Sequence, residues 1–164
     1  MWWERFCNNA CQKKILQKLL NSIFCLICGF INRIMAKKFP FTVERTFKSS
    51  PTILYNFLTT PSGLVQWFAD YVDLDPNGEV FTFEWNGEEQ IAEVLAYEED
   101  EFIKLRWDDE EDDKAFFEYR IRVTDITKET ILTVTDFAEK DELDSSRELW
   151  KSQLNDLAKA LGNG

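Results

Sequence analysis

The stretch Phe117-Glu118-Tyr119-Arg120-Ile121-Arg122-Val123 alternates strictly between apolar and charged side chains. Successive side chains of a β-strand point to opposite faces of a sheet, so the alternation predicts a strand with one apolar and one charged face. A charged face is typical of antiparallel sheets that have one side in water. We therefore expect an antiparallel sheet here, with Glu118, Arg120 and Arg122 pointing to solvent.

The same period of two extends outward from this strand, from Tyr71 to Ala138. Turn signals interrupt it at 75–78, where the sequence reads Asp-Pro-Asn-Gly, at Asn86-Gly87, and at the acidic stretches 98–101 and 108–113. These breaks predict about six antiparallel strands. A further alternating segment, Phe39 to Phe47, predicts a strand before them, which gives a sheet of about seven strands.

Two short helices are predicted between the first strand and the rest of the sheet. Ser50-Pro51 and Thr60-Pro61 each place a capping hydroxyl before a proline, which is tolerated at the first helical position. We expect helices at 51–59 and 61–70. The second would present one apolar stripe, made of Leu64, Trp67, Phe68 and Tyr71.

The chain ends in a segment with helical periodicity. Ser145 and Glu148 have the spacing of a capping box, and Gly162 is suited to a left-handed helix end. The apolar residues between them recur every three or four positions: Trp150, Leu154, Leu157 and Leu161. One long helix over one sheet predicts an α+β fold, in which a curved antiparallel sheet grips the C-terminal helix.

Charge and composition exclude several kinds of function. The formal net charge is −11, and residues 35–164 alone carry 14 Lys and Arg against 29 Asp and Glu. Such a surface repels nucleic acid and anionic membranes. Residues 35–164 contain neither Cys nor His, which excludes a thiol nucleophile, an imidazole base and a Cys/His zinc site from this part of the chain. We expect a cytoplasmic domain without metal or cofactor.

Residues 1–34 differ from the remainder in charge and cysteine content. They hold all four cysteines and have five basic residues against one acidic residue. Their apolar stretch 19–31 is short for a membrane span. Because Met35-Ala36-Lys37-Lys38 resembles a translation start, we interpret 1–34 as an over-extended start, with a membrane-targeting leader as the alternative. Cys25 and Cys28 have redox-motif spacing but lack its strand–helix context.

Several segments of residues 35–164 together resemble a START-like (helix-grip) domain of the SRPBCC superfamily. The resemblance lies in Ser50-Pro51, Leu54–Leu58, Thr60–Leu64, Trp67–Asp70, Val134–Glu139 and Leu149-Trp150. More narrowly, the sequence is similar to small bacterial START-like proteins allied to the activator of the ninety-kilodalton heat-shock chaperone. The superfamily includes lipid carriers, polyketide cyclases, hormone receptors and co-chaperone domains. The resemblance therefore implies a fold rather than one function.

Large aromatic residues form the first candidate site. They lie on elements that should border the space between the sheet and the last helix, where amphipathic rings can line a ligand cavity. The alternative is that these side chains simply fill the core. The candidates are Trp67, Trp85, Trp107, Tyr119, Trp150 and Leu154.

Residues 73–84 match the spacing of a calcium-binding EF-hand loop. The ligands would be Asp73, Asp75, Asn77 and Glu84. However, 80–85 alternates as a strand, and on a strand Glu84 cannot curl back to the ion. We therefore favour a Pro-Asn-Gly β-turn between two strands, with no metal site.

Catalysis would have to use carboxylates, for example Glu84, Glu93, Glu118 or Asp136, with Tyr119 as a possible acid. No spacing pairs two of them. We therefore predict a module that binds a hydrophobic small molecule or a protein surface and is not an enzyme. The alternatives are a co-chaperone-like regulator of the heat-shock ATPase, docking through the acidic loop 108–113, and a cofactor-free cyclase or dehydratase. As a simple loop, 108–113 would be a solvated tip.

Overall fold

The computed structural model describes residues 37–126 and 128–162, and these residues contain one seven-stranded antiparallel sheet. Its strand order is β1-β7-β6-β5-β4-β3-β2. The strands are β1 (Lys38–Phe47), β2 (Tyr71–Leu74), β3 (Val80–Trp85), β4 (Glu88–Glu98), β5 (Phe102–Trp107), β6 (Phe117–Val123) and β7 (Thr130–Glu139). The predicted sheet of about seven strands is confirmed.

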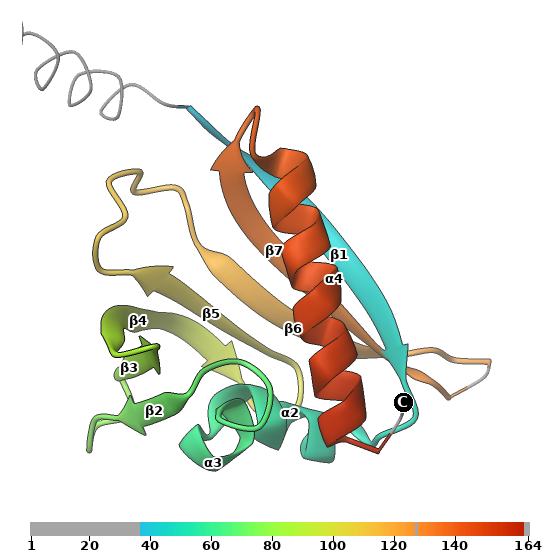
Figure 1. Ribbon diagram of the computed structural model, residues 1–164. Helices are drawn as coiled ribbons and strands as arrows, with labels where there is room; N and C mark the ends of the chain where they lie inside the picture. The colour runs from blue at the N-terminus through green and yellow to red at the C-terminus, as the bar shows by residue number, and fades with distance from the viewer. Residues whose placement is uncertain (1–36, 127, 163–164) are drawn as a thin grey trace, which may run out of the picture. The chain divides into compact units, whose positions relative to one another are not determined.

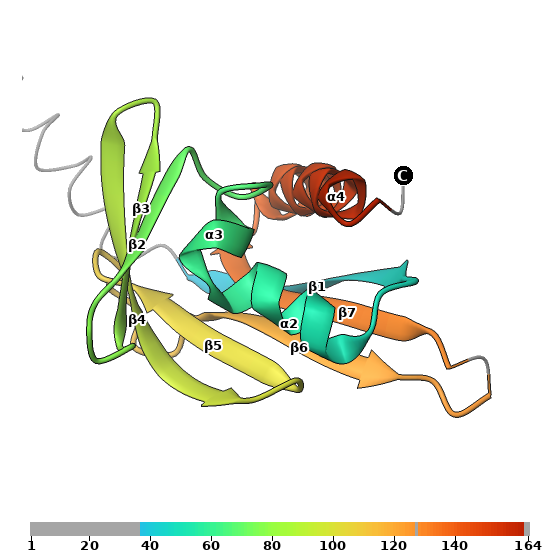
Figure 2. The ribbon, with the colours of Figure 1, turned by 90° about the horizontal axis from the view of Figure 1, so that it is seen from below.

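Three helices accompany the sheet: α2 (Pro51–Thr59), α3 (Pro61–Leu64) and α4 (Leu143–Ala160). All three lie on the same side of the sheet, and the end formed by β2, β3 and β4 curls toward them (Figure 2). Helix α4 packs against β1 and β7, and α2 packs against β5 and β6 (Figure 1). The α+β arrangement of a curved sheet around a C-terminal helix is therefore confirmed.

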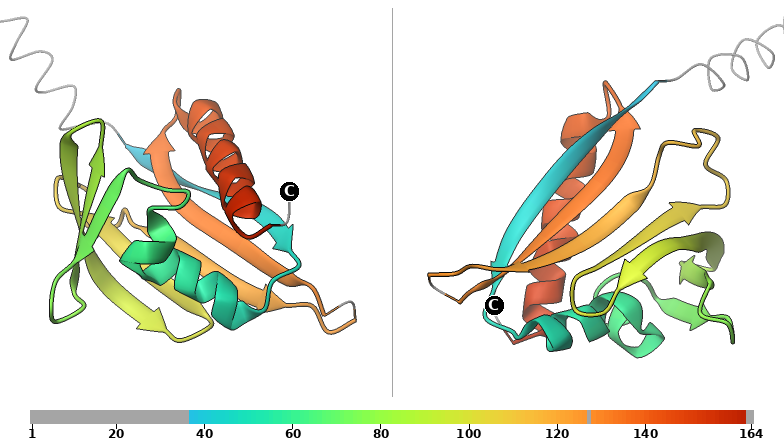
Figure 3. Two further views of the ribbon diagram at one scale, coloured as in Figure 1. Left: turned by 60° about the horizontal axis from the view of Figure 1, so that its bottom comes forward. Right: turned by 180° about the vertical axis from the view of Figure 1, so that it is seen from behind.

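The core lies between the sheet and the helices, as the period of two requires. On β6, Phe117, Tyr119 and Ile121 are buried on the inward face. The inward residues of β7 and the apolar stripe of α4, Leu132, Val134, Trp150, Leu154 and Leu157, join the same core. Seen from behind, the opposite face of the sheet is turned to the viewer, and β1 and β7 cross in front of α4 (Figure 3, right). We call this the outward face.

The predicted N-caps of the first two helices are present. The Ser50 hydroxyl accepts a hydrogen bond from the backbone N–H of Ile53, and the Thr60 hydroxyl accepts one from Gly63. The second helix is shorter than predicted, because α3 ends at Leu64 and the chain then turns through Trp67 and Phe68 toward the sheet.

The reason for the early end of α3 is the pairing of the following strand. The backbone N–H of Asp70 donates to the carbonyl of Glu84, and Tyr71 pairs with Glu84 as β2 begins. Tyr71 is 53% exposed. It was wrongly predicted to continue the apolar helical stripe.

The capping box predicted at Ser145 is also wrong. Helix α4 begins at Leu143, and its N-cap, Glu142, makes no side-chain capping bond. The Ser145 hydroxyl instead donates to the carbonyl of Glu142, inside the first turn. At the other end, Gly162 has a φ of 70°, so the predicted left-handed stop is confirmed.

None of the helices within residues 37–126 and 128–162 combines the length and the hydropathy of a membrane-spanning segment. The predictions for residues 1–34, an over-extended start or a leader, concern residues outside the described part of the chain.

Candidate functional site

The six residues predicted to line a ligand cavity all lie on the helix side of the sheet, and the structure brings the five rings into one cluster. The Tyr119 ring is 5.8 Å from the ring of Trp150 and 6.1 Å from that of Trp67. Trp85 and Trp107 lie 6.2 Å apart, and Phe68, Phe83 and Phe117 join the two groups. Leu154 is buried beside them on α4.

Hydrogen bonds hold the indole rings of Trp67 and Trp85 in this cluster. The N–H of Trp67 donates to the carbonyl of Phe57 at 3.0 Å, and that of Trp85 donates to the carbonyl of Phe68 at 2.7 Å. Buried indoles normally need such a partner, and here the partner belongs to the protein itself. The cluster therefore has the geometry of a packed core, and its role as a ligand site stays a prediction.

Asp136 is the carboxylate that faces this cluster. Its Oδ2 accepts the indole N–H of Trp150 at 2.7 Å, and its Oδ1 accepts the backbone N–H of Phe137. Burial raises the pKa of the Asp136 carboxyl, while the Trp150 and Phe137 bonds act in the opposite direction. An acid of this kind is ionised less readily than an exposed aspartate.

Tyr119 lies next to Asp136, and its hydroxyl is buried without a hydrogen-bond partner among the described residues. Burial, and then the charge of Asp136, raise the pKa of the Tyr119 phenol well above its usual value of 10.0. The hydroxyl therefore keeps its proton more firmly than a free tyrosine. The two groups considered for catalysis are adjacent, but both are held within the core.

The other three carboxylates considered for catalysis lie on the outward strand positions. Glu93 pairs with Arg106, and Glu84 lies on β3 opposite Tyr71. Glu118 was predicted to point to solvent, and this is wrong, because it is only 7% exposed. Outward direction on a strand does not ensure exposure where long neighbouring side chains cover the position.

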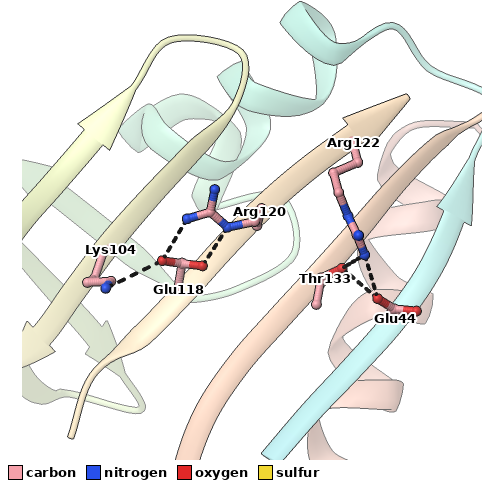
Figure 4. Close-up of polar contacts among 6 residues, drawn as sticks. All are labelled: Glu44, Lys104, Glu118, Arg120, Arg122 and Thr133. Atoms are coloured by element: carbon pink, nitrogen blue, oxygen red, sulfur yellow. Dashed lines mark hydrogen bonds and ion pairs between the residues drawn. The ribbon is translucent and has the colours of Figure 1, made fainter. Parts of the chain in front are cut away.

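Two cations cover Glu118. Arg120 donates to both of its carboxylate oxygens, at 2.9 and 3.2 Å, and the Lys104 ammonium lies 3.6 Å away (Figure 4). Arg120 also lies over the ring of Phe102, and Lys104 over the ring of Phe116. A second, more exposed group, Arg122 with Glu44 and Thr133, lies farther along the same face.

The residues of the calcium-loop pattern lie in a turn and on the two strands that flank it. The chain turns at Asp75–Gly78, with Gly78 at a φ of 76°, and Glu84 is on β3. The Asp75 carboxylate accepts the backbone N–H groups of Val80, Glu79 and Asn77, which lower its pKa. Asp73 lies on β2. Across the part of the chain that the structure describes, no acidic cluster suited to a metal is present.

A hollow lies beside α2, on the helix side of the sheet. It is a cavity of about 590 Å³ between α2 and the β2–β5 half of the sheet. Its apolar lining is Leu74, Phe81, Val94, Leu95, Ala96 and Ile103, and its polar side chains are Tyr55, Thr59, Asn77, Glu79 and Tyr97. None of the six predicted cavity residues lines it.

A β-bulge shapes the wall of this cavity. On β4, Val94 pairs with Leu105 and Ala96 with Lys104, so Leu95 is an additional residue. Residues 94–97 all border the cavity, and the additional residue leaves Val94 opposite Leu105 and Tyr97 opposite Ile103, so that both are paired with buried inward residues although they are three positions apart. The sequence carried a signal for this, because Val94-Leu95-Ala96-Tyr97 interrupts the alternation, but our prediction did not use it.

A second, smaller cavity of about 390 Å³ lies between the α3–β2 connection and the end of α4. Trp67 and Trp85 line it, together with Asp70, Asp156 and Lys159. Trp107, Tyr119, Trp150 and Leu154 line neither of these two cavities.

Comparison with solved structures gives the same architecture. The solution NMR structure of BfR322 from Bacteroides fragilis is 34% identical, over 76% of this chain and 92% of that chain, with a TM-score of 0.56. The Aha1 dimer from Colwellia psychrerythraea is 18% identical over 77% and 99%, with a TM-score of 0.64. MLL2253 from Mesorhizobium loti is 20% identical over 76% and 97%, with a TM-score of 0.63. The last two similarities concern the fold alone.

No curated protein matches the sequence. The family model described as a START-like superfamily domain matches residues 35–163, which is well over half of the chain. This chain therefore belongs to the START-like superfamily.

Proposed function

We propose that the domain binds a small hydrophobic molecule in the cavity of about 590 Å³ between α2 and the β2–β5 half of the sheet. This volume lies within the range of roughly 300–1,000 Å³ that is usual for small-molecule sites. The lining is apolar with a few polar groups, as such sites require. The START-like fold, which is used for ligand or protein binding, is consistent with this role.

The observation that carries the proposal is the bulged wall of the cavity. Leu95 and Tyr97, a large aliphatic and a large aromatic side chain at the bulge, border the cavity and are 42% and 67% exposed. A bulge that changes the direction of side chains beside a hollow is a common way to shape a binding site at a strand. The aromatic cluster would then form the rigid floor near the site rather than the site itself.

The test is a panel of fatty acids, sterols, isoprenoids and aromatic polyketides, measured by thermal unfolding and calorimetry. A ligand at about a hundred times its dissociation constant stabilises the folded state by about 2.7 kcal/mol, which gives a shift of several degrees. We expect binding to be lost in Val94→Phe, which adds a ring at a half-buried lining position paired with the inward residue Leu105.

The matched control is Thr42→Phe, at an exposed position of β1 outside the lining of the cavity. It should fold and bind as the unmodified protein does. Absence of any ligand response across the panel, or binding that survives Val94→Phe, would exclude this cavity as the site.

The co-chaperone hypothesis rested on the acidic loop 108–113. Glu110 in this loop is not a free charge, because it forms an ion pair with Lys38 at 2.5 Å and accepts the backbone N–H of Asp112. This corrects the interpretation of the whole run as a solvated tip. Asp108, Asp109, Glu111 and Asp113 remain exposed, so electrostatic docking to the chaperone stays a prediction that salt-dependent binding would test.

A further inference from the structure

The cavity between α2 and the β2–β5 half of the sheet has an acidic rather than a neutral lining. Glu79 is its one charged side chain among the described lining residues, none of which is Lys or Arg. Hydrogen bonds in the cavity can come from Tyr55, Tyr97 and Asn77. A ligand carboxylate would therefore find hydroxyl and amide donors there, but no lining cation to pair with.

Further negative charge lies in the turn between β4 and β5, close to Tyr55. Burial, and then the phenol of Tyr97 and the charges of Glu99 and Asp100, raise the pKa of Tyr55. In this turn, Glu99 is exposed and Asp100 is half-buried. The surroundings of Tyr55 therefore disfavour any additional negative charge at this position, including that of a ligand carboxylate.

Asp100 also has unused hydrogen-bonding capacity. Its Oδ2 accepts the Thr52 hydroxyl at 2.6 Å, whereas its Oδ1 is buried and has no hydrogen-bond partner among the described residues. A buried carboxylate oxygen without a hydrogen-bond donor is unfavourable. A donor placed near it would therefore contribute more binding free energy than a donor placed near an exposed carboxylate.

We propose that this cavity selects by charge, taking a neutral or cationic amphiphile, such as a long-chain alcohol or amine, and rejecting the corresponding carboxylate. This inference rests on the proposed function, because it concerns the same cavity. Its basis is the combination of Glu79 in the lining, Glu99 and Asp100 beside Tyr55, and no lining cation among the described residues.

The experiment compares ligands that differ only in the head group: dodecanol, dodecylamine and dodecanoate, each below its micellar concentration, by isothermal titration calorimetry at neutral pH. We expect dodecanoate to bind at least about tenfold more weakly than the other two, a difference of about 1.4 kcal/mol. Coulomb repulsion from one fixed charge reaches that size at about 12 Å with an effective dielectric of about 20.

Two variants locate the effect. Glu79→Gln should strengthen dodecanoate binding relative to dodecanol, because it removes the charge in the lining. Glu89→Gln, at an exposed position near the other end of β4, removes the same charge away from the cavity and should leave the ratio unchanged. Added salt should reduce the difference between dodecanoate and dodecanol.

The two proposals fail in different ways. Dodecanoate binding as tightly as dodecanol, with both lost in Val94→Phe, would overturn charge selection and leave the binding site standing. Binding of dodecanol or dodecylamine that persists in Val94→Phe, or no binding by any of the three together with silence across the wider panel, would overturn the proposed function itself.

Discussion

Tyr119 and Glu118 are neighbours on β6, and both are nearly fully buried, with exposures of 2% and 7%. Tyr119 faces the helices, is surrounded by rings, and leaves its hydroxyl without a partner among the described residues. Glu118 faces outward, and both of its carboxylate oxygens are bound by cations. Burial on the inward face is thus achieved by packing, and on the outward face by charge pairing.

This difference has an energetic consequence. Removal of atoms from the packed face leaves a cavity that the surrounding side chains cannot fill. Removal of a charge from the outward face leaves cations that can turn to water, since the side chains of Arg120 and Lys104 are 41% and 30% exposed. Stability should therefore depend much more strongly on the inward face.

The largest effect is expected for Leu154→Ala on α4. Leu154 is 1% exposed, so the substitution should lower the free energy of unfolding by about 2–5 kcal/mol, measured by urea denaturation. Leu149→Ala is the control on the same helix, because Leu149 is 59% exposed and its loss should cost less than about 0.5 kcal/mol. Equal losses in the two variants would contradict the packing of α4.

A smaller effect is expected for Glu118→Gln on the outward face. The variant loses the charge that binds Arg120 and Lys104, but both cations regain hydration. We therefore expect the free energy of unfolding to fall by about 1–2 kcal/mol. Glu44→Gln breaks the pair with Arg122, in which both side chains are more than half exposed, and should change stability by less than about 0.5 kcal/mol.

The measurement is the difference in the free energy of unfolding between the two variants, obtained by urea denaturation at low and at high salt. Salt screens the exposed Glu44 pair more than the covered Glu118 group, so the gap between the variants should persist as salt rises. If Glu118→Gln lowers the free energy of unfolding no more than Glu44→Gln does, the burial of Glu118 contributes nothing to stability.

The contrast between the faces also explains which features were predictable from the sequence. Alternation along 117–123 specified the two faces, and Ser50 and Thr60 specified two helix starts, because these signals act within a few residues. The depth of Glu118 was not predictable, since it depends on Lys104 on the neighbouring strand and on the aromatic rings beneath the cations. Similarly, the end of α3 depends on pairing with β3.

The candidate site shows the same division between local and distant causes. The period of two and the helical spacing predict that the rings of Trp67, Tyr119 and Trp150 border the space between sheet and helix, but their packing against one another depends on the whole fold. The cavity of about 590 Å³ combines α2 with four strands. The one local signal for it, the apolar run 94–97, indicates a bulge without indicating what faces it.

Apart from the exposed control variants, the smallest net effect on stability at neutral pH, and the sharpest pH dependence, are expected for Asp136→Asn. Asp136 is a charge-bearing residue on the packed face, where burial raises its pKa above the usual 3.8. The folded state therefore binds a proton more tightly than the unfolded state does. The stability from this carboxyl is fully present below pH 3.8 and decreases as the pH rises through the raised pKa.

Asparagine does not ionise, so the unmodified protein should lose stability relative to Asp136→Asn as the pH rises from about 3.5 to 7. At neutral pH, relief from burying a charge opposes the loss of one acceptor for the Trp150 or Phe137 N–H, so the net change should stay within about 1 kcal/mol. Urea denaturation at stepped pH measures the trend, with Glu44→Gln as the exposed carboxyl control. A difference that grows in the opposite direction would mean that the Trp150 and Phe137 bonds outweigh burial, and that Asp136 is stabilised as an anion within the packed face.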